Sequence, residues 1–231
     1  MSDEHPITEI RVLYRDDAMV VVDKPSGIQV HRGAERSEVV AMSLIRDQLG
    51  QWVYPVHRLD APTSGVLAFA LSSEHARAIQ ASFAERRVEK EYLALVFGEV
   101  PERGVIDSPM RKNKRKKGGP EVEAITHYER LFLTDGGGLS YVRVRPLTGR
   151  MHQIRRHFRR IHHRLAGDVQ YGRGPDNQRL REELGLHRLA LHASRLTLPH
   201  PITGEPVHVR ADLPDDLAQP LARAGVPPSH T

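Results

Sequence analysis

The stretch HRLDAPTSGVLAFAL, residues 57–71, places an aspartate just before a turn that leads into an unbroken apolar run. The run Val66 to Leu71 is typical of a buried strand. Asp60 is therefore expected at a sheet edge beside a cleft. An aspartate two residues before Pro62 is also a common turn residue, so this stretch by itself leaves a chemical and a structural interpretation open.

The rest of the chain mixes strands and helices without regular alternation. Alternating or continuous apolar runs predict strands, helical spacing predicts helices, and polar stretches predict loops. We expect a strand pair at 10–23, strands at 91–98, 124–133, 139–145, 189–198 and 206–209, helices at 39–49, 72–83 and 151–165, loops at 104–119 and 172–183, and a frayed tail at 225–231. This order favours an α+β protein with a mixed sheet.

The composition narrows the class of protein. The chain has 231 residues, of which 39% are apolar, so it is long enough for one large domain or two tightly packed halves. It has no cysteine, which excludes disulfides and cysteine-ligated zinc. The first ten residues lack a signal-peptide pattern and no stretch reaches the length of a membrane span. We therefore expect a cytoplasmic protein that does not enter a membrane.

Positive charge gathers in two segments. Lys and Arg outnumber Asp and Glu by 34 to 29 over the whole chain. Residues 111–117 (RKNKRKK) are basic at six of seven positions, and residues 143–164 hold eight arginines and no acidic residue. Charge segregated in this way suits a polyanion as partner. For 111–117 taken alone, a solvated loop is an equally good interpretation.

The 14 histidines make a metal site worth testing. Four of them, His152, His157, His162 and His163, fall on the expected helix, but a spacing of five sets successive side chains about 140° apart. The segment has no carboxylate and the chain has no HExxH pair, so we expect no metal. The chain also lacks a phosphate-binding glycine loop and a G-x-S-x-G nucleophile turn.

Five segments, collinear along the chain, resemble the motifs of the RluA family of pseudouridine synthases. They are KPSG at 24–27 with His31, HRLDAPTSG at 57–65, KEYLALV at 90–96, TGRMHQIRRH at 148–157, and LHA at 191–193 with HP at 200–201. Any one of these could arise by chance. Five in the family's order identify the chain as a member.

Within the family, the chain is most similar to the tRNA-acting, TruC-type branch of tRNA pseudouridine-65 synthases. The similar segments are AITHY at 124–128, GLHRL at 185–189 and LHAS at 191–194. The resemblance implies the pseudouridine synthase fold, with a mixed, mostly antiparallel sheet, flanking helices and a central catalytic cleft. It also implies one catalytic domain over residues 1–231, in two packed halves, with a basic insertion at about 104–119 and no S4 domain.

The resemblance further implies a catalytic set. Asp60 matches the family's nucleophile, Tyr92 the ring that stacks on the flipped uracil, and Arg155 the partner that keeps the aspartate ionised. A bidentate arginine can do this because it opposes the rise in pKa that burial imposes on a carboxylate. The reaction breaks the glycosidic bond, turns the uracil over and rejoins it through C5. This isomerisation involves no redox change, so no cofactor or metal is expected.

RNA contacts are expected around this set, because the target base must leave its stack to reach Asp60. The candidates are His57, Arg58, Arg111, Lys112, Lys114, Arg115, Lys116, Lys117, Arg150, His152, Arg156, Arg159 and Arg160. The expected partner is RNA, in the first place a tRNA. The expected oligomeric state is a monomer.

Three alternatives stay open. The same site could act on ribosomal RNA, a protein of the same fold could bind RNA without catalysis, and a hydrolase could cleave glycosidic bonds with paired carboxylates. The intact set of Asp60, Tyr92 and Arg155 argues against the second. The third lacks a second carboxylate near Asp60.

Overall fold

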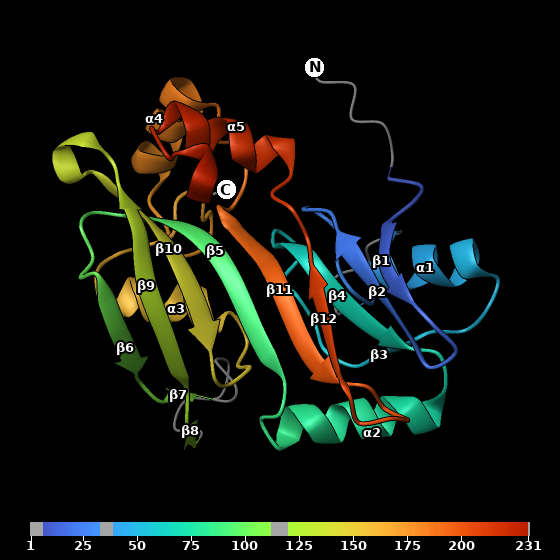
Figure 1. Cartoon of the computed structure of the whole chain (residues 1–231). Coiled ribbons are helices and arrows are strands. Elements are labelled where there is room, and N and C mark those ends of the chain that lie inside the picture. The colour runs from blue at the N-terminus through green and yellow to red at the C-terminus, as the bar shows by residue number, and fades with distance from the viewer. Residues whose placement is uncertain (1–6, 33–38, 112–119, 231) are drawn as a thin grey trace. The chain divides into compact units, whose positions relative to one another are not determined.

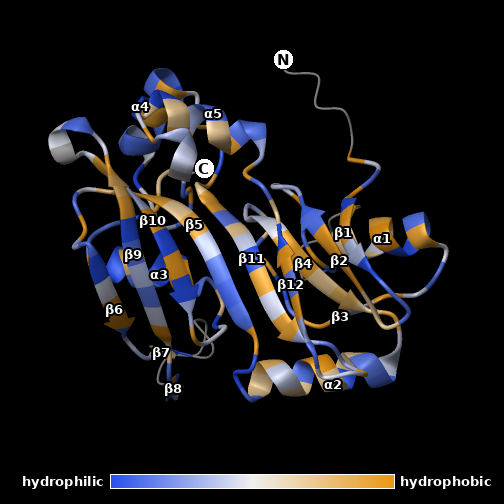
Figure 2. Ribbon diagram, in the orientation of Figure 1, coloured by the Kyte–Doolittle hydropathy of each residue, from blue (hydrophilic) through white to orange (hydrophobic). Residues whose placement is uncertain are grey.

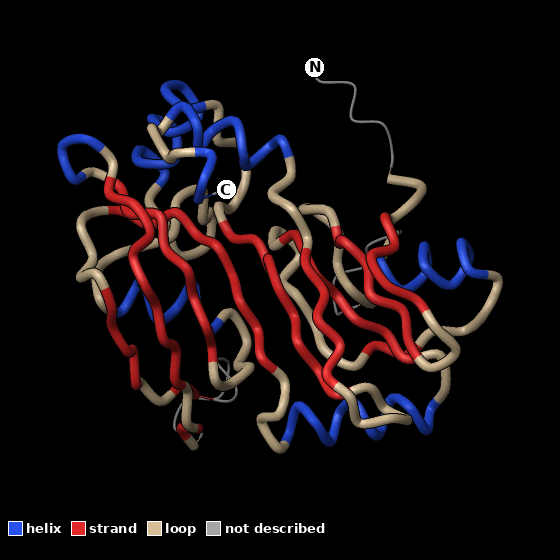
Figure 3. Tube along the Cα trace, viewed as in Figure 1, coloured by secondary structure: helices blue, strands red, loops and turns tan. Residues whose placement is uncertain are grey.

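The chain divides into two compact units. The structure, a computed structural model, describes residues 7–32, 39–111 and 120–230. Unit 1 comprises residues 1–88 and 195–211, and unit 2 comprises residues 89–194 and 212–231. Figure 1 labels the elements of both units, and Figure 3 separates the helices from the strands.

Unit 1 is an antiparallel arrangement of strands with two helices. Its elements are β1 (Arg11–Arg15), β2 (Met19–Lys24), α1 (Ala41–Leu49), β3 (Tyr54–Pro55), β4 (Ser64–Ala70), α2 (Ser73–Ala84), the end of β11 (Leu191–Pro199) and β12 (Pro206–Arg210). Strand β2 pairs with β1 on one side and with β4 on the other, β3 also pairs with β4, and β12 pairs with β11.

Strand β4 is the centre of unit 1, and all seven of its residues are buried. Val66 and Ala68 belong to the same core cluster as Ile79 of α2. Figure 2 shows hydrophobic and hydrophilic residues alternating along α2, as expected for a helix that covers a core with one face. The helix begins after Ser72, whose hydroxyl accepts the amide hydrogen of His75 at 3.0 Å.

Unit 2 is built on a second antiparallel run of strands, in the order β5-β10-β9-β6. Its elements are β5 (Glu89–Phe97), β6 (Arg103–Asp107), β7 (Met110–Arg111), β8 (Glu121–Val122), β9 (Ile125–Leu133), a 3₁₀ turn (Asp135–Gly137), β10 (Leu139–Pro146), α3 (Gln153–Arg160), α4 (Gly174–Leu184), the start of β11, α5 (Asp215–Arg223) and a second 3₁₀ turn (Pro228–His230). Strands β7 and β8 form a separate small hairpin.

Helices cover both faces of the sheet in unit 2. Because successive residues of a strand point to opposite faces, β10 contributes Val144 to one side and Tyr141 to the other. Val144 shares a core cluster with Phe158 of α3, whereas Tyr141 shares a different cluster with Leu180 of α4 and Leu217 of α5. The face that α3 covers is also the face of Tyr92, so it is the face of interest for function.

The α+β class with mostly antiparallel pairing is confirmed, and the expected strands and the first two helices lie within a few residues of their predicted bounds. The polar loop expected at 172–183 is wrong, because α4 occupies most of it. This helix has proline in its first turn and ends at Gly185, which adopts the left-handed conformation with φ 69°. Its buried contribution is small, chiefly Leu180, so the apolar spacing was too sparse to predict it.

The helix expected at 151–165 is shorter than predicted, since α3 ends at Arg160. His162 takes the left-handed conformation with φ 67°, and the amides of His162 and His163 bond back to the carbonyls of Arg159 and Phe158 at 3.1 and 2.9 Å. This is the Schellman pattern of helix termination, here with histidine where glycine is usual. Leu165 lies beyond the helix and forms an isolated bridge with Val96.

Two further expectations need correction. The segment 104–119 was predicted to be a loop, but its described part contains most of β6 and all of β7, while residues 112–119 lie outside the described residues. The frayed tail at 225–231 is also wrong in part, because Val226 is only 3% exposed and packs in the cluster of α4 and α5. Helix α5, just before it, was not predicted.

Candidate active site

The loop that carries Asp60 in unit 1 is held by a buried lysine. Lys24 is fully buried, and its ammonium group donates hydrogen bonds to the carbonyls of Pro25, Ile28 and Ala61 at 2.8, 2.9 and 3.1 Å. A buried ammonium group needs several acceptors, and these three join the turn after β2 to the loop before β4. The segment KPSG at 24–27 therefore has a structural role, because its lysine holds the Asp60 loop in place through the Ala61 carbonyl.

Further hydrogen bonds fix the same loop from within. The Ser26 hydroxyl donates to the Pro62 carbonyl at 2.9 Å, and the amide of Gly27, whose φ is 96°, donates to the Ala61 carbonyl at 2.9 Å. The Thr63 amide donates to the carbonyl of Asp60 at 3.0 Å, which closes the turn into β4. The Asp60 side chain itself is half-buried. A carboxylate on so constrained a loop is pre-positioned for chemistry.

The two predicted RNA contacts beside Asp60 differ in exposure. Arg58 is exposed, as an RNA contact requires. His57 is half-buried, its Nε2 accepts the amide hydrogen of Ala68 in β4 at 3.0 Å, and its ring lies 5.1 Å from that of Phe83. The contacts of His57 therefore attach the Asp60 loop to β4 and to Phe83 of α2.

Tyr92 lies in β5 of unit 2, on the face that α3 covers. It is half-buried and packs against the cluster that includes Ala94 and Phe158. Lys90 is two residues earlier and points to the same face. Its ammonium group donates to the Thr148 carbonyl at 3.2 Å, and its pKa is lowered to about 8 because burial disfavours the charge and Arg150 adds to the repulsion.

Arg155 is the best-defined member of the predicted set. Its side chain is only 4% exposed. Its Nε and Nη2 donate to the two carboxylate oxygens of Asp168, each at 2.8 Å. The Tyr171 ring lies 5.0 Å from the centre of the guanidinium group. This bidentate pair fixes the plane of the guanidinium group and leaves Nη1 outside the fork.

Asp168 is itself held in place by its own loop. One of its oxygens accepts the amides of Gln170 and Tyr171, both at 2.9 Å, and its carbonyl accepts the Asn177 side chain at 3.0 Å. Burial alone raises the pKa of this carboxyl, but the hydrogen bonds from Arg155 and the two amides outweigh burial and lower the pKa below its usual value. Asp168 therefore stays ionised and positions Arg155.

Sequence reasoning missed Asp168 and Tyr171. A usable signal existed, because Asp168 is the sole acidic residue between Asp135 and Asp176, a span that contains all eight arginines of the basic segment. A buried arginine needs a counter-charge, so the only nearby carboxylate was the natural candidate. The argument requires knowing that Arg155 is buried, which the sequence did not establish.

A second polar network joins the start of α3 to the neighbouring strands. The Gln153 side chain accepts from the Thr148 hydroxyl at 2.7 Å and donates to that of Thr126 at 2.9 Å. His157, fully buried, bonds to the Thr126 hydroxyl at 2.8 Å and to the Ser108 carbonyl at 3.1 Å. Burial lowers the pKa of His157, and the charges of two neighbouring arginines of α3 add to this. A neutral ring with its proton on Nε2 satisfies both contacts.

The remaining predicted RNA contacts lie in unit 2 or outside the described residues. Arg111, Arg150, Arg159 and Arg160 are exposed, Arg156 is half-buried, and His152 is half-buried with its Nδ1 at 2.9 Å from the Tyr171 hydroxyl. The positions outside the described residues are Lys112, Lys114, Arg115, Lys116 and Lys117. The structure thus brings His152, Arg155 and Tyr171 together, on the unit that also carries Tyr92.

Over residues 7–32, 39–111 and 120–230, no group of three His, Cys, Asp or Glu side chains is arranged so that it could hold a metal ion. Within the same residues, none of the helices is long and apolar enough to cross a membrane.

Comparison with known proteins identifies the class. The profile of the family described as RNA pseudouridylate synthase matches residues 18–160, which include Asp60, Tyr92 and Arg155. The chain belongs to this family. The enzyme class is therefore that of isomerases that convert uridine to pseudouridine.

Individual relatives are more specific. The chain is 41% identical over 220 residues to the tRNA pseudouridine synthase C of Haemophilus ducreyi, covering 88% of this chain and 90% of the relative. It is 40% identical over 233 residues to the protein of the same name from Vibrio parahaemolyticus, covering 93% and 95%. Among solved structures, human RNA pseudouridylate synthase domain containing 4 is similar, with a TM-score of 0.76, 26% identity and coverage of 93% of each chain.

Proposed function

We propose that this protein converts one uridine of a tRNA to pseudouridine, at a position of the type modified by the tRNA pseudouridine-65 synthases. The relatives named tRNA pseudouridine synthase C, about 40% identical over nearly the whole chain, support tRNA over ribosomal RNA as substrate. The proposal includes a cytoplasmic enzyme that acts as a monomer. RNA of this kind is found in the cytoplasm, and one chain carries Asp60, Tyr92 and Arg155.

Asp60 is the proposed nucleophile. The reaction cleaves the bond between C1′ and N1, the uracil turns and C1′ joins C5. The proton on C5 is then released to solvent, and N1 takes up a proton, so the product is an isomer of the substrate. A carboxylate can stabilise the developing charge or form a covalent adduct only if it is ionised and close to the base and sugar. The hydrogen bonds of the Lys24 turn hold the Asp60 loop in one conformation, which reduces the entropic cost of reaching that geometry.

Arg155 is the proposed partner of the reactive carboxylate, and the observation that carries this role is its fork on Asp168. Because Nε and Nη2 are both bound to Asp168, the direction of Nη1 is fixed. The pair as a whole is neutral, so Arg155 acts through a directed hydrogen bond more than through a full uncompensated charge. In this account Asp168 is a positioning residue, and Tyr92 supplies the ring on which the flipped uracil stacks.

Tritium release tests the chemistry. With tRNA carrying tritium at C5 of uridine, the wild type should release label in proportion to pseudouridine formed. Asp60→Asn should bind the tRNA and release no label, while the matched control Asp47→Asn, at an exposed carboxylate of α1, should behave as wild type. Release by Asp60→Asn near the wild-type rate would overturn the role of Asp60. No release by the wild type on any RNA would favour a protein that binds RNA without catalysis.

A further inference from the structure

The sheet of unit 2 has a charged region on the face opposite to Tyr92. Tyr92 and Val144 are paired in the register of β5 and β10 and point toward α3. The residues next to them, Glu91, Arg143 and Arg145, therefore point to the other face. On that face the cluster of α4 and α5 covers only the end of the strands near Tyr141.

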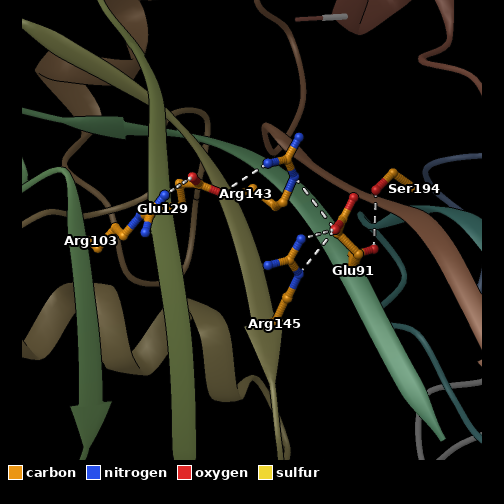
Figure 4. Close-up of polar contacts among 6 residues, drawn as sticks. All are labelled: Glu91, Arg103, Glu129, Arg143, Arg145 and Ser194. Carbon is orange, nitrogen blue, oxygen red and sulfur yellow. Dashed lines mark hydrogen bonds and ion pairs between the residues drawn. The ribbon is translucent and has the colours of Figure 1, made fainter.

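Five side chains on this face form an alternating ladder across four strands (Figure 4), which we call the arginine ladder. Arg103 of β6 donates to Glu129 of β9 at 3.2 Å, and Arg143 of β10 donates to the same carboxylate at 2.9 Å. Glu91 of β5 accepts from Arg145 at 2.8 and 3.1 Å, and its nearer oxygen is 3.5 Å from Nε of Arg143. Each carboxylate is thus shared by two guanidinium groups.

Two of the three arginines are more exposed than the carboxylates. The side chains of Arg103 and Arg145 are 82% and 56% exposed, whereas those of Glu129 and Glu91 are 30% and 14% exposed, and Arg143, between the two carboxylates, is 31% exposed. Three arginines and two glutamates leave a net charge of one positive. The hydrogen bond from Arg143 is the largest cause that lowers the pKa of Glu129, so Glu129 stays ionised in mildly acidic solution.

The arginines keep donors for a further ligand. A guanidinium group has five N–H donors, and in the ladder Arg103 and Arg143 each use one on a carboxylate while Arg145 uses two. Nε of Arg143 is buried beside Glu91, so the donors that this residue keeps for a ligand are on its terminal nitrogens. The carboxylates below fix the side chains, so a ligand that binds the free donors does not have to order three long side chains.

These arginines border a hollow of about 550 Å³. It is lined by Arg103 and Val105 of β6, His127 and Glu129 of β9, and Arg143 and Arg145 of β10. Exposed ion pairs contribute only about 0–1 kcal/mol each to stability, so stability alone is a weak reason to gather three arginines here. A tetrahedral oxyanion with several acceptors matches convergent guanidinium donors much better.

We propose that the arginine ladder binds a phosphate of the RNA backbone, on the face of unit 2 opposite to Tyr92. The choice of RNA as the source of the phosphate rests on the proposed function. Strand β6 is the last strand in the order of this sheet and leads directly into the hairpin of β7, where Arg111 is exposed. A structured RNA bound near Tyr92 can reach the ladder by passing over this edge, and the contact orients RNA without reading its sequence.

Binding of tRNA to the full-length Asp60→Asn protein, measured over a range of salt concentrations, tests the proposal. Arg103→Gln and Arg145→Gln should each weaken binding about eightfold at about 0.1 M salt and reduce the slope of log K against log salt by about 0.9, the value for one phosphate contact. The matched control is Arg179→Gln, which removes an exposed arginine paired with Glu183 on α4 of the same unit and should change neither quantity.

A charge variant of opposite sign gives a second readout. Glu129→Gln raises the net charge of the ladder, so it should tighten RNA binding. If both arginine variants bind as Arg179→Gln does, the ladder does not contact RNA and the proposal fails. It also fails if the hollow binds inorganic phosphate, seen by NMR titration, while RNA affinity is unchanged in both variants. Failure of the wild type to form pseudouridine while these variants still lose RNA affinity would overturn the proposed function and not the ladder.

Discussion

Replacing Asp168 by asparagine is the sharpest test of how Arg155 is held. The substitution keeps the size of the side chain but removes the negative charge opposite a guanidinium group that is only 4% exposed. It also replaces one of the two oxygens that Arg155 binds with an amide NH₂, which donates and cannot accept. The variant therefore removes the negative charge that Asp168 places against a buried cation, together with one of the two hydrogen bonds of the fork.

The magnitude follows from burial. Removing one partner of a buried ion pair costs about 3–5 kcal/mol, out of a total stability of about 5–15 kcal/mol for a typical protein. We expect Asp168→Asn to lower the free energy of unfolding by about 3 kcal/mol or more, measured by urea denaturation near neutral pH. The control Glu183→Gln breaks a pair whose side chains are 57% and 59% exposed, so it should cost less than about 1 kcal/mol.

A double variant separates positioning from general damage. In Arg155→Met/Asp168→Asn no buried cation remains, so its stability should exceed the value expected from adding the losses of the two single variants. It should nevertheless form no pseudouridine. If Asp168→Asn costs no more than Glu183→Gln, or if the two single effects simply add, the claim that Asp168 holds Arg155 is refuted.

Three further predictions concern stability. Burial is the largest cause that lowers the pKa of His157, so below the ordinary value of 6.5 the unfolded chain binds a proton that the folded protein does not. The free energy of unfolding should therefore fall as the pH drops below 6.5. His157→Gln should show less of this fall, measured by urea denaturation at two pH values. The pKa of Lys90 is lowered to about 8, so between pH 8 and the ordinary pKa of 10.5 the unfolded chain binds more protons than the folded protein. The free energy of unfolding should therefore rise with pH over this range. Lys90→Met should lose this rise, so its free energy of unfolding should differ from that of the wild type in a pH-dependent way. Gly167→Ala would place a Cβ 1.9 Å from the Arg188 carbonyl and should lower the thermal midpoint far more than Gly136→Ala, where φ is similarly positive but nothing lies within 4 Å; equal shifts would contradict this.

The sequence was sufficient for the class of fold and for the collinear motifs, because these depend on local pattern. The apolar run after Asp60 predicted β4, and Ser72 predicted the start of α2. It was not sufficient for α4, whose one fully buried leucine gives no periodic signal, or for the end of α3, where His162 takes a conformation that is usually left to glycine. Both depend on tertiary packing, which can override local preference.

The sequence identified which residues belong to the motifs better than it predicted the contacts that these residues make. Lys24 was recognised as part of a motif, but only the structure shows that its ammonium group links the turn of β2 to the Asp60 loop through three carbonyls. Arg155 was assigned to the reactive carboxylate, and its fork on Asp168 was not foreseen. Contacts of this kind join positions that are 13 or 37 residues apart, and no local pattern encodes them.

A map of pseudouridines at single-nucleotide resolution tests the central claim most directly. RNA is compared from cells that lack the gene, from the same cells complemented with the wild type, and from cells complemented with Asp60→Asn. We predict that one pseudouridine in tRNA is lost with the gene, is restored by the wild type and is not restored by Asp60→Asn. Restoration by Asp60→Asn, or a loss confined to ribosomal RNA, would contradict the account.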